Sequence, residues 1–119
     1  MGQFAVSISH AKDNTDKATV AFVIANAAAG SDQDTTVFLS SEGIHLATKG
    51  YADDMHEEGF APLKELIDSF VEAGGQIWVC SPCFKKRGYD ESNLIDGTTI
   101  VGGAKLVELL STGAPHVSY

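Results

Sequence analysis

The stretch from Gly74 to Gly88, GGQIWVCSPCFKKRG, constrains this chain most, because it holds both cysteines and three of the eight basic residues. Residues 76–79 alternate in the manner of a short strand. Ser81 followed by Pro82 is then a helix-start signal, with serine as the N-cap and proline at the first helical position. Cys80 should therefore lie where a strand ends and a helix begins. At that edge of an open α/β sheet, ligands bind and a helix N-terminus contributes partial positive charge.

Cys80 is the candidate nucleophile of this stretch. A thiol at a helix N-terminus is biased toward thiolate, the nucleophilic form, and nearby cations favour the charged sulfur further. Cys83 lies three residues on, inside the first helical turn, where its sulfur can approach that of Cys80. The residues that we expect to stabilise the thiolate are Ser81, Lys85, Lys86 and Arg87.

Two plainer interpretations of the cysteines stay open. Free cysteine is among the residues most often buried, where it acts as a small apolar side chain. The Cys-x-x-Cys spacing is also half of a zinc site, but the chain has no second cysteine pair and its four histidines stand singly. We therefore expect neither a metal nor a cofactor.

The length and composition of the chain narrow its class. With 119 residues, 44% hydrophobic and 20% charged, the chain fits one core, so we expect a single domain over residues 1–119. The net charge of -8 argues against binding nucleic acid through a basic face. Neither a signal-peptide pattern nor an apolar run of membrane length occurs, so we expect a cytoplasmic protein with no membrane partner. In the cytoplasm a close thiol pair is more often catalytic, redox-active or metal-binding than structural.

Strand patterns and helix patterns alternate along the chain. Strands are predicted at 4–9, 35–40, 76–79, 98–101 and 116–119. Helices are predicted at 15–29, 44–48, 63–72, from 81 onward and at 104–110, with an acidic surface loop at 49–60. This order predicts an α/β three-layer sandwich, in which helices cover a mostly parallel sheet of about five strands.

The helix predicted at 15–29 is apolar on nearly all sides between Ala18 and Ala29. Packing one face of a helix against one sheet does not bury so wide an apolar arc. We therefore expect a second subunit to cover the remainder, and the small alanines permit its close approach.

Several short motifs follow one another in a distinctive order. They are the strand 36–39 with EGI at 42–44, GGQIWVC at 74–80 leading to KRG at 86–88, and LIDG at 94–97 before GGA at 102–104. Over nearly the whole chain, this ordered set resembles the DsrE/DsrF-like family of small α/β sulfur-handling proteins, which includes the DsrE and TusD sulfur-relay subunits. The resemblance implies a persulfide on the cysteine that ends this strand, here Cys80. It also implies sulfur donor and acceptor proteins or small persulfides as partners, and assembly into homotrimers or homohexamers.

Cys83 departs from the relay subunits, which carry a small apolar residue at its position. A persulfide on Cys80 can be attacked by Cys83, which releases sulfide and leaves a disulfide. Three functions therefore stay open. They are sulfur transfer by a sulfurtransferase or sulfur carrier with Cys83 as the resolving thiol, a Cys-x-x-Cys thiol-disulfide redox module, and a non-catalytic oligomeric binding subunit.

Overall fold

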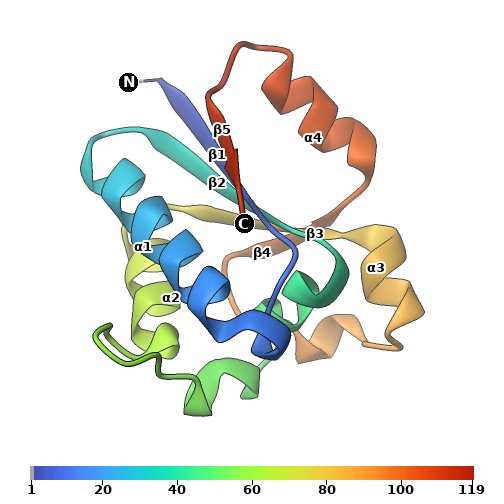
Figure 1. Cartoon of the computed structure of the whole chain (residues 1–119). Coiled ribbons are helices and arrows are strands. Elements are labelled where there is room, and N and C mark those ends of the chain that lie inside the picture. The colour runs from blue at the N-terminus through green and yellow to red at the C-terminus, as the bar shows by residue number, and fades with distance from the viewer. Residues whose placement is uncertain (1) are drawn as a thin grey trace.

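A five-stranded sheet, in which every neighbouring pair of strands is parallel, forms the middle layer of the computed structural model (Figure 1). The structure describes residues 2–119. The strands are β1 (Gln3–Ile8), β2 (Asp34–Leu39), β3 (Gln76–Cys80), β4 (Thr98–Val101) and β5 (His116–Ser118). Their spatial order is β4-β3-β2-β1-β5. The predicted α/β sandwich with a parallel sheet of about five strands is confirmed.

Helices cover both faces of this sheet. They are α1 (Thr15–Gly30), α2 (Leu63–Glu72), α3 (Ser81–Lys86) and α4 (Gly103–Leu110). Short 3-10 turns are η1 (Lys12–Asn14), η2 (Ser41–Ala47), η3 (Tyr51–Asp54) and η4 (Glu91–Asn93). The helices α1 and α2 pack side by side on one face, and α4 lies over the other (Figure 1). The short helix predicted at 44–48 is thus a longer 3-10 turn, and the predicted loop at 49–60 contains another.

Alternate strand residues point to opposite faces of the sheet, so each face has its own set of apolar side chains. The apolar cluster on one face is much larger than that on the other. On the α1 and α2 side lies the main core, where Phe22 and Phe70 meet edge to face with ring centroids 5.9 Å apart. On the α4 side a small cluster of Phe38, Trp78 and Val101 meets two leucines of α4. The main core therefore fixes the sheet, and α4 adds a thinner cover.

Asn14 caps the N-terminus of α1. The side chain of Asn14 accepts a hydrogen bond from the backbone N–H of Lys17 at 3.1 Å, which satisfies one of the free donors of the first turn.

Within residues 2–119, none of the helices is both long and apolar enough to cross a membrane.

The chain crosses the sheet between its last two strands. From β4 at one edge it runs through α4 and reaches β5, which pairs with β1 at the opposite edge (Figure 1). The backbone N–H of Ala5 on β1 donates to the carbonyl of Pro115 just before β5, at 2.9 Å. Residues far apart in sequence therefore share this edge.

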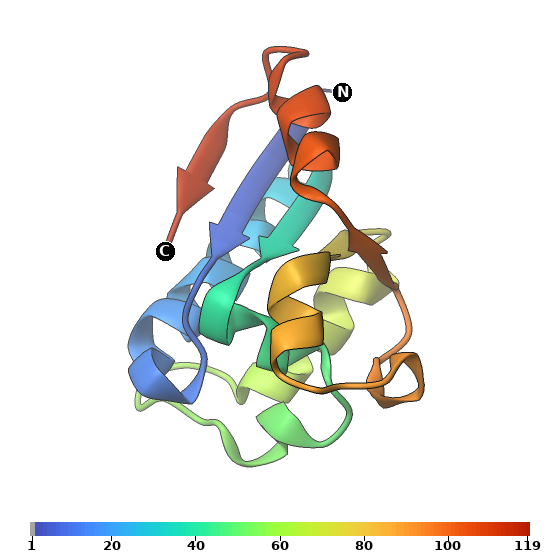
Figure 2. The same cartoon turned by 90° about the vertical axis from the view of Figure 1, so that its right-hand side faces the viewer.

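Because all the strands are parallel, their carboxyl ends meet at one edge of the sheet. The turns η1 and η2 follow β1 and β2 there, and α3 follows β3, as Figure 2 shows. This edge brings together three segments that are separate in sequence, and it holds both cysteines.

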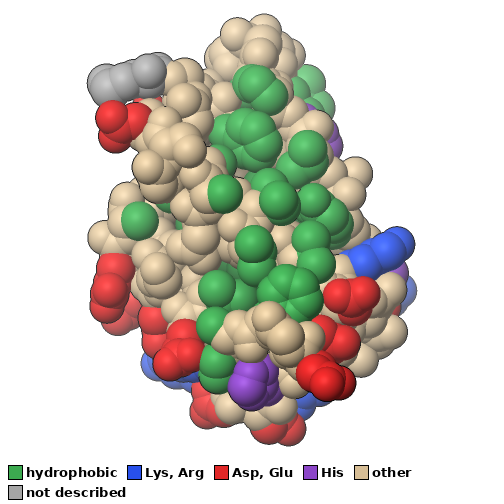
Figure 3. All heavy atoms as spheres, turned by 60° about the vertical axis from the view of Figure 1, so that its left-hand side comes forward, with side chains coloured by type: hydrophobic (Ala, Val, Ile, Leu, Met, Phe, Trp, Pro, Cys, Tyr) green, Lys and Arg blue, Asp and Glu red, His purple; other side chains and the backbone are tan. Residues whose placement is uncertain are grey.

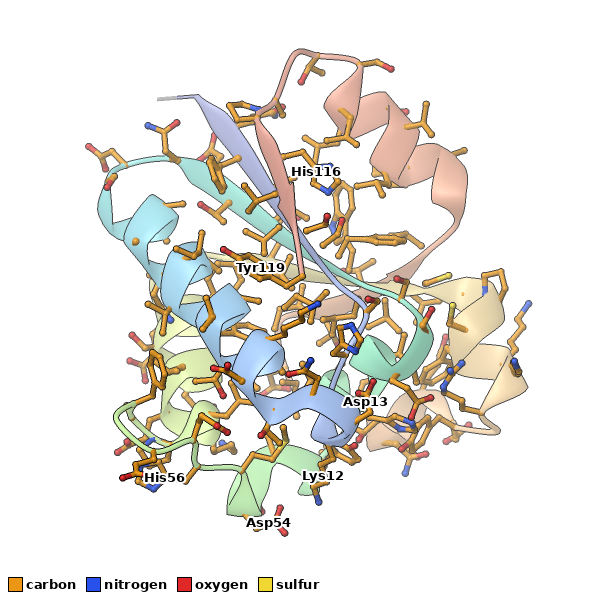
Figure 4. The ribbon with its side chains drawn as sticks, viewed as in Figure 1. Lys12, Asp13, Asp54, His56, His116 and Tyr119 are labelled. Carbon is orange, nitrogen blue, oxygen red and sulfur yellow. The ribbon has the colours of Figure 1, made fainter. Side chains whose placement is uncertain are left out.

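The acidic segment after η2 makes local structural contacts. Asp54 of η3 pairs with Lys12 of η1 at 3.1 Å, and the two side chains point toward each other (Figure 4). Glu57 accepts a hydrogen bond from the Thr15 hydroxyl at 2.7 Å. Among residues 2–119, the histidine, cysteine and acidic side chains form no group of three or more that could hold a metal ion.

Candidate functional site at the end of β3

Both cysteines are free and half-buried at the carboxyl end of β3. Cys80 is the last residue of the strand, and Cys83 lies in the first turn of α3. Both side chains pack against the main core, and Cys80 also touches the smaller cluster under α4. The two thiols lie close enough for each to influence the pKa of the other. The predicted approach of the two sulfurs is therefore confirmed.

The turn η2 contributes a hydrogen bond to this pair. The backbone N–H of Ser41 donates to the Sγ of Cys83 at 3.2 Å. Ser41 has a φ of 51°, in the left-handed region that side chains seldom adopt. Gly43, two residues on, fits so tightly that a Cβ there would lie 2.2 Å from the carbonyl oxygen of Ile8. The end of β1 therefore holds the turn that presents this N–H to the sulfur.

Arg87 ties η2 to α3. Its Nη2 and Nε donate to the Oε2 of Glu42 at 2.8 and 3.2 Å, and its Nη1 donates to the carbonyl of Cys83 at 3.2 Å. The Arg87 side chain is only 18% exposed, so solvent competes weakly for these bonds. The planar guanidinium engages all three of its nitrogens at once, which a lysine ammonium cannot reproduce.

His45 extends this network from the other end of η2. Its Nδ1 lies 2.6 Å from the hydroxyl of Tyr89, and its Nε2 lies 3.5 Å from the Oε1 of Glu42. Its ring also stacks on Tyr51, with centroids 5.0 Å apart. The hydrogen bond from Arg87 is the main cause that lowers the pKa of Glu42, so Glu42 stays an anion at neutral pH.

The two thiols titrate in opposite directions. Burial would raise the pKa of Cys83, but the Ser41 N–H, the Cys80 thiol and the charges of Arg87 and Lys86 outweigh burial and lower it. For Cys80, burial is the main cause of a raised pKa; the backbone N–H of Cys83 opposes it, and the neighbouring Cys83 sulfur adds to it. Of the two thiols, Cys83 is therefore the one whose ionisation its surroundings favour.

The prediction that Cys80 has a lowered pKa is wrong, for two physical reasons. Burial of its sulfur at the strand end favours the neutral thiol. In addition, α3 has only 6 residues, and Cys80 itself occupies the N-cap position without any side-chain cap bond. The N-cap role that the sequence assigned to Ser81 is therefore also wrong, because Ser81 is the first helical residue.

The three predicted cations have different surroundings. Arg87 influences both sulfurs and Lys86 influences Cys83, whereas Lys85 is exposed in the last turn of α3. The sequence reasoning assigned no site role to Ser41, Glu42, His45 and Tyr89. A usable signal for Glu42 was its place in the turn that follows β2, because the carboxyl ends of neighbouring parallel strands meet at one edge.

A separate hollow lies on the sheet face beneath α4. It measures about 590 Å³ and is lined by side chains of the sheet and of α4, including Trp78, Gln76 and Lys105. The Nζ of Lys105 lies 5.8 Å from the centroid of the Trp78 ring. Neither cysteine lines this hollow.

The sequence matches known proteins along most of its length. The model of the DsrE/DsrF-like family matches residues 3–119. The uncharacterized protein MJ0760 of Methanocaldococcus jannaschii is 33% identical over 98 residues, which are 82% of this chain and 36% of MJ0760. The uncharacterized protein MK0008 of Methanopyrus kandleri is 30% identical over 95 residues, 80% of this chain and 75% of MK0008. The chain thus spans about a third of the longer relative.

Solved structures share the fold. The crystal structure of the YchN protein from E. coli has a TM-score of 0.80 and 19% identity, covering 98% of this chain and 99% of YchN. The protein of unknown function MTH1491 from Methanobacterium thermoautotrophicum has a TM-score of 0.69 and 14% identity, covering 99% of this chain and 98% of MTH1491. At these identities the likeness shows a common fold.

Proposed function

Because this chain belongs to the DsrE/DsrF-like family, we propose that it accepts sulfane sulfur as a persulfide on Cys80 and transfers it to a partner. The observation that carries this proposal is the close pair of free cysteines at the carboxyl end of β3. Parallel α/β sheets bind their ligands at this edge. The resemblance described above implies a persulfide on the cysteine that ends this strand.

The persulfide on Cys80 has two possible fates, and the second of them depends on Cys83. A partner thiolate can attack the outer sulfur of the persulfide, which moves that sulfur to the partner and returns the Cys80 thiolate. Alternatively, Cys83 attacks the inner sulfur, which leaves a Cys80–Cys83 disulfide and expels hydrosulfide. The donor is a protein persulfide or a small persulfide in either case.

Mass spectrometry of the intact protein tests the proposal. The reduced protein is incubated with cysteine persulfide and compared with the Cys80→Ser/Cys83→Ser double variant. We expect a gain of one sulfur atom in the wild type and none in the double variant. Equal gain in both would overturn the proposal, and so would the absence of any gain in the wild type.

A thiol-disulfide redox module is the second candidate. The observation that favours it is that both cysteines of the Cys-x-x-Cys pair are free at the junction of β3 and α3, since such pairs exchange disulfides. Loss of two hydrogen atoms with no sulfur gain would support this function. Inert thiols would instead favour a binding subunit, for which the hollow beneath α4 is the candidate ligand site.

We further propose that the chain acts in the cytoplasm, where thiols stay reduced, as a homotrimer or homohexamer. The support for assembly comes from the outer face of α1, where Val20 and Val23 are half-buried and Ala27 is exposed. Figure 3 shows apolar side chains gathered in a band on this side of the molecule. A second subunit on α1 would remove this apolar surface from water.

A further inference from the structure

The positions of Ser41, Glu42 and Arg87 around one sulfur suggest a division of labour between the cysteines. We infer that Cys83 is the sulfur that first attacks the donor, that Arg87 positions it by joining α3 to η2, and that Cys80 receives the sulfur second. This inference rests on the proposed sulfur-transfer function and assigns roles within it.

The first support is the hydrogen bonding of the Cys83 sulfur. The Sγ of Cys83 accepts a hydrogen bond from the Ser41 N–H on η2 at 3.2 Å. This donor stabilises a negative charge on the sulfur, and the lowered pKa of Cys83 agrees. A thiolate is the form of cysteine that attacks a persulfide. Cys80, whose pKa is raised mainly by burial, stays protonated at the same pH.

The second support is the placement of Arg87. The Arg87 guanidinium donates to the backbone carbonyl of Cys83 and to the carboxylate of Glu42. Glu42 directly follows Ser41 in the sequence. The distance from the Ser41 N–H to the sulfur therefore depends on the Arg87–Glu42 contact. Among residues 2–119, Arg87 donates hydrogen bonds to Glu42 and to the Cys83 carbonyl but to neither sulfur, so its role is positional and electrostatic.

The charged and titratable groups around Cys83 come from several elements. They are Cys80 at the end of β3, Lys86 and Arg87 at the end of α3, Glu42 and His45 of η2, Tyr89 beyond α3, and Asp13 of η1, which acts through Glu42. Glu42 is already an anion at neutral pH, because its pKa is lowered chiefly by the Arg87 bond. The change that governs attack near neutral pH is therefore the ionisation of Cys83 itself.

The chemistry balances without an oxidant or a reductant. The Cys83 thiolate attacks the outer sulfur of a persulfide R–S–SH, a new S–S bond forms, and R–S⁻ leaves with the electron pair of the old bond. Cys83 then carries –S–SH, and R–S⁻ takes the proton of the Cys80 thiol. The Cys80 thiolate attacks the outer sulfur, and the Cys83 sulfur leaves as a thiolate with the electron pair of the bond that breaks. The products are a persulfide on Cys80, the thiol R–SH and the Cys83 thiolate.

Stopped-flow transfer from cysteine persulfide, followed by trapping and peptide mass spectrometry, tests the order of the two cysteines. In Cys80→Ser, we expect sulfur still to enter and to remain on Cys83, because the attacking sulfur is retained and the second acceptor is lost. In Cys83→Ser at pH 7, we expect entry to slow by about tenfold or more, because a thiol with a raised pKa is almost fully protonated there. The pH midpoint of entry should rise in the same variant.

Arg87 variants separate position from charge. Arg87→Lys keeps the charge but loses the planar fork, and Arg87→Gln loses both, so the pH midpoint of entry should rise in the order wild type, Lys, Gln. Lys64→Gln on α2 removes one positive charge from a pair with Asp68, away from η2 and α3, and is the matched control. Iodoacetamide alkylation of Cys83 against pH gives the thiol midpoint without any sulfur transfer.

The outcomes distinguish this inference from the proposed function. If Cys83→Ser accepts sulfur at the wild-type rate with an unchanged pH midpoint, Cys80 attacks first and the inference fails while the sulfur-transfer function stands. If neither the wild type nor any variant gains sulfur, the proposed sulfur-transfer function is wrong. The alkylation midpoints then still show which of the two thiols ionises first. If Arg87→Gln shifts the midpoint no more than Lys64→Gln does, Arg87 does not position Cys83.

Discussion

The backbone N–H of Ser41 and the sulfur of Cys83 lie 3.2 Å apart although the residues are separated by 42 positions in sequence. The contact exists because β2 and β3 are neighbouring parallel strands, so the turn that leaves one meets the helix that leaves the other. Cys83 thus receives a donor from a neighbouring strand, whereas burial at the end of its own strand is the main influence on Cys80.

The first prediction concerns the two thiol pKa values. In Cys80→Ser, where a serine hydroxyl can still donate to Cys83, the alkylation midpoint of Cys83 should lie below the unperturbed cysteine value of about 8.5. In Cys83→Ser, the midpoint of Cys80 should lie above that value, because burial remains after the neighbouring sulfur is lost. Iodoacetamide rates measured against pH give both midpoints, and a lower midpoint for Cys80 would contradict the assignment.

The second prediction concerns the three cations after the cysteines. Arg87→Gln should raise the Cys83 midpoint most, Lys86→Gln less and Lys85→Gln least, following the contacts that each makes. High salt should weaken the Lys86 effect strongly, because at 1 M the Debye length is about 3 Å. The Arg87 effect should persist, since its bonds are largely shielded from solvent. Equal shifts for all three would show that only net charge matters.

The third prediction tests the turn that carries Ser41. Gly43→Ala should destabilise the fold by about 1 to 3 kcal/mol, because its Cβ has no room beside the Ile8 carbonyl. The displaced turn should also raise the Cys83 midpoint. Urea unfolding and alkylation measure the two effects.

Gly30→Ala provides the matched control, because open space surrounds that position at the end of α1. It should leave the Cys83 midpoint unchanged and stabilise the protein by up to about 1 kcal/mol. If Gly43→Ala behaves like Gly30→Ala, the turn is not held by the end of β1.

The fourth prediction concerns assembly. Light scattering at micromolar concentration should show a homo-oligomer, and Val23→Glu should reduce the mass, because it places a charge on the apolar outer face of α1. Lys17→Glu, an exposed polar position on the same helix, is the control and should leave the mass unchanged. A monomeric wild type would contradict the proposal.

The strands and helices were largely predictable because their signals are local. The apolar spacing of α2, the Asn14 cap and the strand patterns all lie within a few residues of what they specify. The two-cysteine stretch was also readable, since its place at a strand end follows from adjacent residues. The order of the strands was not predicted, because it depends on which distant segments pair.

The ionisation of the site was misjudged for a related reason. A sequence shows that Cys80 precedes a helix and nearby cations, and these cues favour a thiolate there. It does not show the burial of the sulfur or the Ser41 N–H that reaches Cys83 from another strand. The Glu42–Arg87 pair spans 45 positions and was likewise invisible to local patterns.

The crossing from β4 to β5 has a consequence for how the chain acquires its structure. Ser7 on β1 and His116 on β5 meet although 109 positions separate them, so the sheet stays incomplete until residues 116–118 are made and docked. Such distant pairings are slow to form, because the intervening chain must first lose much of its freedom. Until then the open side of β1 presents unpaired backbone groups, and a second chain can pair there in place of β5. Docking of β5 onto β1 therefore covers a strand edge that would otherwise be open to pairing between chains.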